Sequence, residues 1–81
     1  MRYQLSSKAR AQYEALATHE RRAFQKQVDY LVANLRHPSL HAKKYDEATG
    51  LWQARVNHSW RFYFLIQEDV YYVVGIRKHP K

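Results

Sequence analysis

Residues 50 to 81 read G-L-W-Q-A-R-V-N-H-S-W-R-F-Y-F-L-I-Q-E-D-V-Y-Y-V-V-G-I-R-K-H-P-K, and this stretch decides the fold. It is rich in aromatic and β-branched residues, which favour strands. Short polar breaks divide it at residues 57–59 and 68–69, and tight connections of this kind join antiparallel neighbours. We therefore predict an antiparallel meander of three strands, over residues 51–57, 60–67 and 70–77.

Alternation along these strands separates an apolar face from a cationic one, because side chains two residues apart share a face. The face expected to form the core carries Trp52, Ala54, Val56, Trp60, Phe62, Phe64, Ile66, Val70, Tyr72, Val74 and Ile76. The opposite face carries Gln53, Arg55, Asn57, Arg61, Tyr63, Tyr71 and Arg77. Cations mixed with aromatic rings are typical of surfaces that hold phosphates and stack on unpaired bases. The assignment takes the strands to pair without a bulge.

Working outward, the first half of the chain predicts two helices and two further strands. Residues 2–6 alternate like a strand, and Ser6 is a good N-cap for a helix over residues 8–17. A stripe of helical period predicts a second helix from residue 18, which ends before Pro38. A short strand is expected over residues 42–46. The order β-α-α-β-β-β-β predicts one α+β domain over residues 1–81, with a helical hairpin packed on one face of a small, mainly antiparallel, twisted sheet.

The composition limits the partners and the compartment. The chain has 81 residues, a formal net charge of +7 and no cysteine. A positive field of this size attracts polyanions, so a nucleic acid or an acidic protein is expected to bind, although the charge alone also favours solubility. The absence of cysteine favours a reducing cytosol. No apolar run is long enough for a membrane helix or a signal peptide, so we predict a cytoplasmic protein without membrane contact.

Arginines and a histidine near the end of the chain are the candidate site. Arg55, Arg61 and Arg77 share the cationic face, where they could hold a phosphate and stabilise charge on it. The alternative is that they form ion pairs with Asp46, Glu47, Glu68 or Asp69, or simply cover the sheet. His79 follows Arg77 by two residues, and its ordinary pKa of about 6.5 suits proton transfer, although a histidine near a terminus is more often simply solvated.

Other motifs are weaker. Lys43 and Lys44 lie at the short predicted strand and are expected to contact phosphate or water. His37 and His41 have a metal-binding spacing only on a continuous helix, which Pro38 interrupts, so we expect no metal and no cofactor. Arginine with histidine, and without a metal, indicates ribonuclease chemistry in which a 2′-hydroxyl attacks the adjacent phosphate.

The element order resembles that of the RelE/ParE superfamily of bacterial toxins. The motifs Gly50-x-Trp52-x-x-Arg55-Val56, Trp60-Arg61-x-x-Phe64 and Arg77-x-His79 are most similar to those of RelE and YoeB-type messenger RNA interferases. The resemblance implies a RelE-like fold and the toxin of a type II toxin–antitoxin pair. Such a toxin enters the ribosomal A site, cuts messenger RNA by 2′-hydroxyl attack beside the ribosomal RNA, and is neutralised by a small acidic antitoxin.

The resemblance also assigns residues. Arg61, Arg55 and His79 match the family's phosphate-stabilising arginine, its common strand arginine and the YoeB-type histidine, and they are the implied catalytic set. The implied RNA-binding set is Arg77, Lys43, Lys44, Tyr63 and Lys78. The family's glutamate falls on Ala42 here, which leaves Glu47 in the nearby turn as a candidate base, and Pro80 replaces the family's terminal tyrosine.

Two other functions fit the same fold. A ParE-like toxin would poison DNA gyrase by protein contact, without nuclease activity. A silent relative would bind RNA or an antitoxin without cutting. The pairing of Arg61 with His79 favours the nuclease, because a gyrase-binding protein has no evident need for it.

Overall fold

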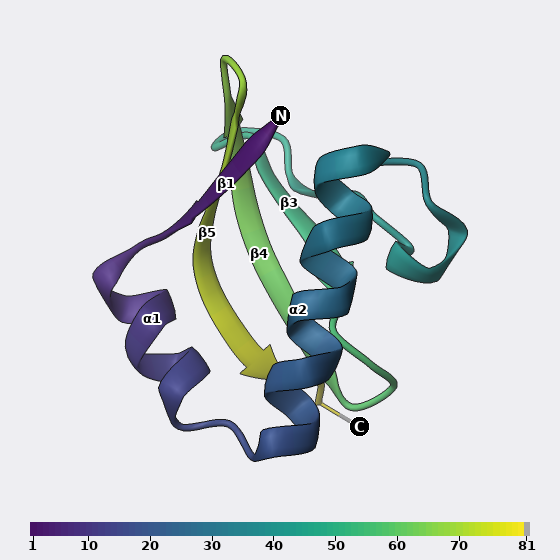
Figure 1. The fold of residues 1–81 in the computed structure, drawn as a ribbon. Coiled ribbons are helices and arrows are strands. Elements are labelled where there is room, and N and C mark those ends of the chain that lie inside the picture. The colour runs from purple at the N-terminus through teal and green to yellow at the C-terminus, as the bar shows by residue number, and fades with distance from the viewer. Residues whose placement is uncertain (81) are drawn as a thin grey trace.

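Five strands and two helices form the computed structural model, which describes residues 1–80 (Figure 1). The elements are β1 (Arg2–Leu5), α1 (Ser7–Glu14), α2 (Thr18–Ala33), the 3-10 helix η1 (Pro38–Leu40), β2 (Lys43–Asp46), β3 (Leu51–Arg55), β4 (Trp60–Gln67) and β5 (Val70–Lys78). The predicted α+β fold and element order are confirmed, and the final position of the predicted domain, residue 81, lies outside the described residues. No helix within residues 1–80 is both long and apolar enough to cross a membrane.

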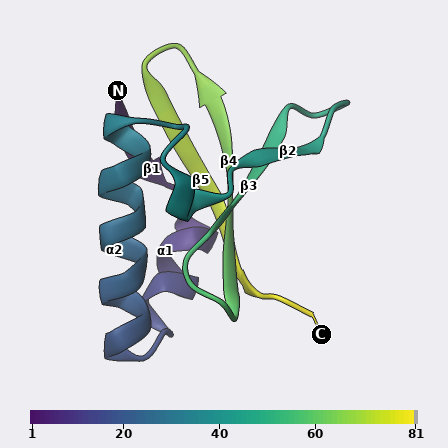
Figure 2. The same ribbon diagram turned by 90° about the vertical axis from the view of Figure 1, so that its right-hand side faces the viewer.

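The strands form a single sheet in the order β1-β5-β4-β3-β2. β1 pairs with β5 in parallel, and every other neighbouring pair is antiparallel, as the predicted meander requires. Figure 2 shows both helices on one side of the sheet, while β2 and the end of β5 extend away from the helices. The face of the sheet that carries the predicted cations is therefore not covered by a helix.

The core lies between α2 and the sheet. Phe24 and Leu31 of α2 are fully buried, as the helical stripe predicts. The Phe24 ring packs edge-to-face on Phe62 of β4, with the ring centroids 5.3 Å apart. Phe62 in turn lies beside Phe64. The apolar parity predicted for β3 and for most of β4 is thus correct.

A bulge in β5 changes the parity predicted for that strand. Tyr63 pairs with Gly75 but Phe64 pairs with Val73, so Val74 is an extra residue. Before the bulge, Tyr71 and Val73 face the core, and the prediction that Tyr72 and Val74 do so is wrong. Tyr71, predicted on the cationic face, packs edge-to-face on Phe64 instead, and its burial raises the pKa of the hydroxyl.

Ile66 is a second exception to the predicted core. It lies one residue before the end of β4 and is 37% exposed. The β4–β5 hairpin projects beyond the helices at this point (Figure 1), so nothing covers the apolar side of the strand there.

Candidate active site

Three arginines lie side by side on the face of the sheet that no helix covers. Arg55 of β3 pairs in register with Arg61 of β4, which pairs in register with Arg77 of β5. Adjacent like charges on one face are destabilising unless something compensates them. The ion pairs found within residues 1–80 join Arg2 to Asp69, His19 to Glu20 and Lys44 to Glu47, so the predicted alternative of structural ion pairs for these three arginines is wrong there. An anion from outside the chain would provide the negative charge that compensates these three arginines.

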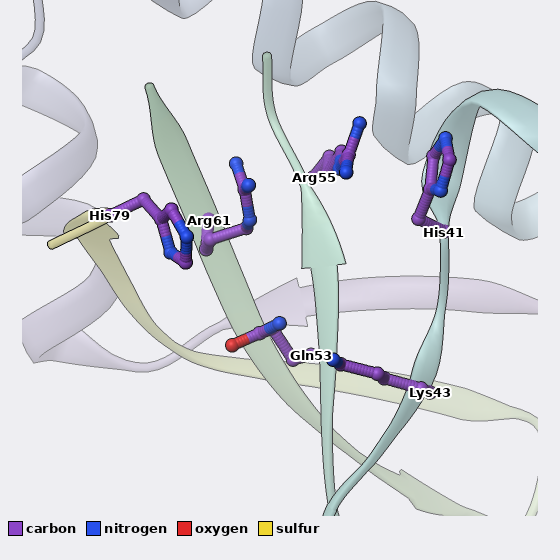
Figure 3. Close-up of a pocket in the computed structure, with 6 residues that line it drawn as sticks. All are labelled: His41, Lys43, Gln53, Arg55, Arg61 and His79. Atoms are coloured by element: carbon purple, nitrogen blue, oxygen red, sulfur yellow. The ribbon is translucent and has the colours of Figure 1, made fainter. Parts of the chain in front are cut away.

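Two of these arginines, Arg55 and Arg61, line a cavity of about 340 Å³ on this face. Its lining residues come from β2, β3, β4 and the segments beside β2 and β5, and they are His41, Lys43, Gln53, Arg55, Arg61 and His79. Figure 3 shows Arg61 and Arg55 between His79 on one side and His41 on the other. None of the residues that line the cavity within residues 1–80 carries a carboxylate. The four sequence candidates Arg55, Arg61, His79 and Lys43 are therefore brought together.

Hydrogen bonds fix the side chain of Arg61 where it lines this cavity. Its side chain is 6% exposed, and its Nη1 donates hydrogen bonds to the carbonyl oxygens of Asn57, His58 and Trp60 at 2.8, 3.2 and 3.1 Å. These bonds fix the guanidinium against the β3–β4 turn and leave Nε and Nη2 for a ligand. Burial, followed by the charge of Arg55, lowers the pKa of Arg61. A bound anion would stabilise the charged form of this desolvated guanidinium.

His79 lies just past the end of β5. Its backbone N–H donates to the carbonyl oxygen of Ser59 at 2.7 Å, which ties the segment to the β3–β4 turn. Partial desolvation, and then the charges of Arg61 and Arg55, lower the pKa of His79 below its ordinary value of 6.5. The imidazole is therefore largely uncharged at pH 7, which is the form that accepts a proton.

Arg77 and Tyr63 lie on the same face, next to the cavity. The Arg77 guanidinium carbon is 5.1 Å from the centroid of the Tyr63 ring, and the Tyr63 hydroxyl donates to Gln53 Oε1 at 3.1 Å. Tyr63 is only 8% exposed, so it supports its neighbours and offers little surface to a base. A second cavity, of about 290 Å³, adjoins the first, and its lining residues are Tyr45, Gln53, Tyr63, Arg77, Lys78, His79 and Pro80.

Lys43 and Lys44 lie on opposite faces of β2, because consecutive strand residues alternate. Lys43 lines the first cavity. Lys44 pairs in register with Trp52, lies 5.5 Å from its ring centroid and forms an ion pair with Glu47 at 3.7 Å. Trp52 packs against the core, so the structure does not bring Lys44 or Glu47 to the cavity. Glu47 is thus not placed to act as the general base.

Sequence reasoning missed three residues of the site. The sequence suggests only a metal-ligand role for His41. In the structure His41 lines the cavity, and its backbone adopts a left-handed conformation with φ at 47°. Alternation along the strand predicts the correct face of the sheet for Gln53 but indicates no function for it. Gln27 interrupts the apolar stripe of α2, and that interruption was the signal: a polar residue in such a stripe needs a buried partner.

Gln27 connects α2 to the cavity. It is 4% exposed, and its Nε2 donates to the carbonyl oxygens of Arg55 and Ser39, both at 3.0 Å. Its Oε1 accepts a hydrogen bond from the Ser39 hydroxyl at 3.1 Å. These bonds join the helix to η1 and to the last residue of β3, so they position Arg55.

Gln27→Leu is expected to lower the free energy of unfolding by about 1–3 kcal/mol, because two carbonyl groups lose their buried donor. Urea denaturation followed by circular dichroism measures the change. Lys26→Leu, at the exposed neighbouring position, is the control and should stay within about 0.5 kcal/mol of the parent. Equal unfolding midpoints for Gln27→Leu and the parent would contradict the expected contribution of this link.

Comparison with known proteins identifies the fold. No family model and no curated protein matches the sequence. Among solved structures, a YoeB/ParE toxin from Agrobacterium tumefaciens superposes with a TM-score of 0.82 at 13% identity, over 99% of this chain and 100% of that chain. A RelE–RelB complex from Pyrococcus horikoshii gives a TM-score of 0.79 at 15% identity, over 95% of this chain and 92% of that chain. A YoeB–YefM complex from Staphylococcus aureus gives 0.78 at 13% identity, over 96% and 95%. The resemblance of the fold to RelE/ParE-type toxins is thereby confirmed.

Proposed function

We propose that this chain, which has the fold of RelE- and YoeB-type toxins, is the toxin of a type II toxin–antitoxin pair and cleaves messenger RNA as a metal-independent endoribonuclease. One observation supports the proposal above the others: Arg55, Arg61 and His79 line a cavity to which the described part of the chain, residues 1–80, contributes no carboxylate. Such a cavity suits an anionic ligand whose reaction needs a proton acceptor. A phosphodiester beside a 2′-hydroxyl meets both conditions.

The proposed reaction begins with removal of the 2′-hydroxyl proton by the uncharged imidazole of His79. The 2′-oxygen forms a bond to phosphorus while the bond from phosphorus to the 5′-oxygen breaks. The products are a 2′,3′-cyclic phosphate and a 5′-hydroxyl, and the leaving oxygen takes its proton from water or from a cationic group of the cavity. Arg61 and Arg55 hold the non-bridging oxygens and stabilise the charge that develops on them. Because Arg61 is already fixed, little reorganisation is needed during the reaction.

The proposed partners follow from charge and from the neighbouring structures. Two of the structural neighbours are complexes with the antitoxins RelB and YefM. By analogy, a cognate antitoxin is proposed here, and an acidic one suits the net charge of +7. The proposed substrate is messenger RNA in the ribosomal A site, with ribosomal RNA alongside, so the protein would act in the cytoplasm. Lys43, Arg77 and Lys78 would contact the RNA backbone.

Expression of the protein under an inducible promoter tests the proposal. Growth should stop, and primer extension should map new 5′ ends within translated messages. The purified protein with programmed ribosomes should leave 5′-hydroxyl and 2′,3′-cyclic phosphate ends. Intact messages together with accumulated gyrase–DNA breaks would overturn the nuclease and favour a ParE-like gyrase inhibitor.

A further inference from the structure

A β-bulge in β2 falls at an aromatic residue, Tyr45. Lys44 pairs with Trp52 and Asp46 pairs with Leu51, so Tyr45 is an extra residue between two paired ones. Bulges are common beside active sites. Tyr45 keeps the face of Lys43, two residues earlier, as strand alternation predicts. Tyr45 lines the second cavity, on the same face of the sheet as the arginines.

The Tyr45 ring is exposed but held in place. It is 53% exposed, which is unusual for a large aromatic residue. Its ring packs at 71° against Tyr63, with the centroids 5.1 Å apart. Tyr63 is fixed in turn by its hydrogen bond to Gln53 and by the Arg77 guanidinium. A ring that is already ordered loses little entropy when a flat ligand stacks on it.

The second cavity continues from the first, because Gln53 and His79 line both. A phosphate held by Arg55 and Arg61 would therefore place the adjoining sugar and base of the same strand toward Tyr45. An unpaired base presents a flat π-face that an aromatic side chain stacks on, whatever the base. Polar groups of Gln53 and Arg77 line this cavity as well and could reach the edge of the base.

We propose that Tyr45, supported by Tyr63, forms a subsite that stacks on an unpaired base of single-stranded RNA, next to the phosphate held by the arginines. This inference rests on the RNA cavity of the proposed function. It goes further by naming the nucleotide contact beside the reacting phosphate and the residue that makes it.

Binding of a short single-stranded 2′-O-methyl RNA tests the subsite, because the methyl group prevents cleavage. Fluorescence anisotropy at fixed salt gives the dissociation constant of the full-length protein for this RNA and for an abasic strand of the same length. Tyr45→Ala should weaken binding of the base-bearing strand by roughly 5- to 100-fold, as expected for one lost stacked base. It should leave the abasic strand within about twofold. Tyr45→Phe keeps the ring and should bind like the parent.

Several results would overturn the subsite. Unchanged affinity of Tyr45→Ala for the base-bearing strand would do so, and so would an equal loss for both strands, since that indicates a backbone or folding effect. Failure of the parent to prefer the base-bearing strand would also exclude stacking. Tyr45→Leu keeps a larger apolar side chain than alanine but has no π-face, so it replaces Tyr45→Ala if circular dichroism shows that the alanine variant is unfolded. If Tyr45→Ala weakens binding of the base-bearing strand but the parent protein cuts no RNA, the subsite is retained and the nuclease is refuted. If Tyr45→Ala binds that strand like the parent and the parent protein cuts RNA, the nuclease is retained and the subsite is refuted.

Discussion

Arg61→Ala is expected to reduce RNA cleavage, measured as kcat/KM with ribosomes programmed with a defined message, by about 10²- to 10³-fold. The reason is geometric as well as electrostatic. Three turn carbonyls hold Nη1 and so aim the rest of the guanidinium at the cavity. Removing a preorganised donor takes away stabilisation that grows as charge develops on the phosphate.

Arg61 also supports the turn, so the activity loss must be separated from unfolding. Arg61→Lys keeps a charge, but its ammonium cannot reproduce the planar fork of donors, so it should recover folding better than activity. Arg36→Ala removes an exposed arginine outside the cavity and should cut RNA like the parent. Thermal denaturation by circular dichroism monitors all three variants. A folded Arg61→Ala protein that cleaves at the parent rate would remove Arg61 from the site.

His79→Ala is expected to reduce cleavage by about 10²- to 10⁴-fold, the usual contribution of a positioned acid or base. The side chain is exposed and its loss breaks no side-chain hydrogen bond found within residues 1–80, so stability should change little. His19→Ala, at an exposed position on α2, is the matched control. Full activity of His79→Ala would assign the proton transfer to another group.

The pH dependence gives a sharper test of the same residue. Partial desolvation, and then neighbouring cations, lower the pKa of His79, so its basic form should persist to below pH 6.5. As the pH falls through this lowered pKa, the imidazole is protonated and kcat/KM should decline. Arg55→Gln removes one of those cations and should move the decline to higher pH. A profile that Arg55→Gln leaves unmoved would contradict His79 as the base.

Much of the fold and part of the site could be predicted from the sequence. Strand periodicity and polar breaks are local signals, so the element order and the shared face of Arg55, Arg61 and Arg77 were recoverable. The same alternation correctly aligned Phe62 and Phe64 with the core. It failed in β5, because the bulge at Val74 depends on how two strands fit a twisted sheet, which no local pattern encodes.

The order of the elements and the side of the sheet on which the cations lie therefore follow from the sequence alone, because backbone geometry makes side chains alternate wherever pairing is regular. Which of those cations share a cavity depends on the tertiary structure. The tertiary structure places Lys43 at the cavity and Lys44 on the opposite face, and it keeps Glu47 away from the cavity. It also brings His41 into the cavity lining and links Gln27 to the backbone of Arg55. It packs the Tyr45 ring on Tyr63 beside the site as well. These outcomes depend on contacts between distant segments, such as the link from Gln27 to Arg55, since a buried polar group must find its partner wherever the folded chain provides one.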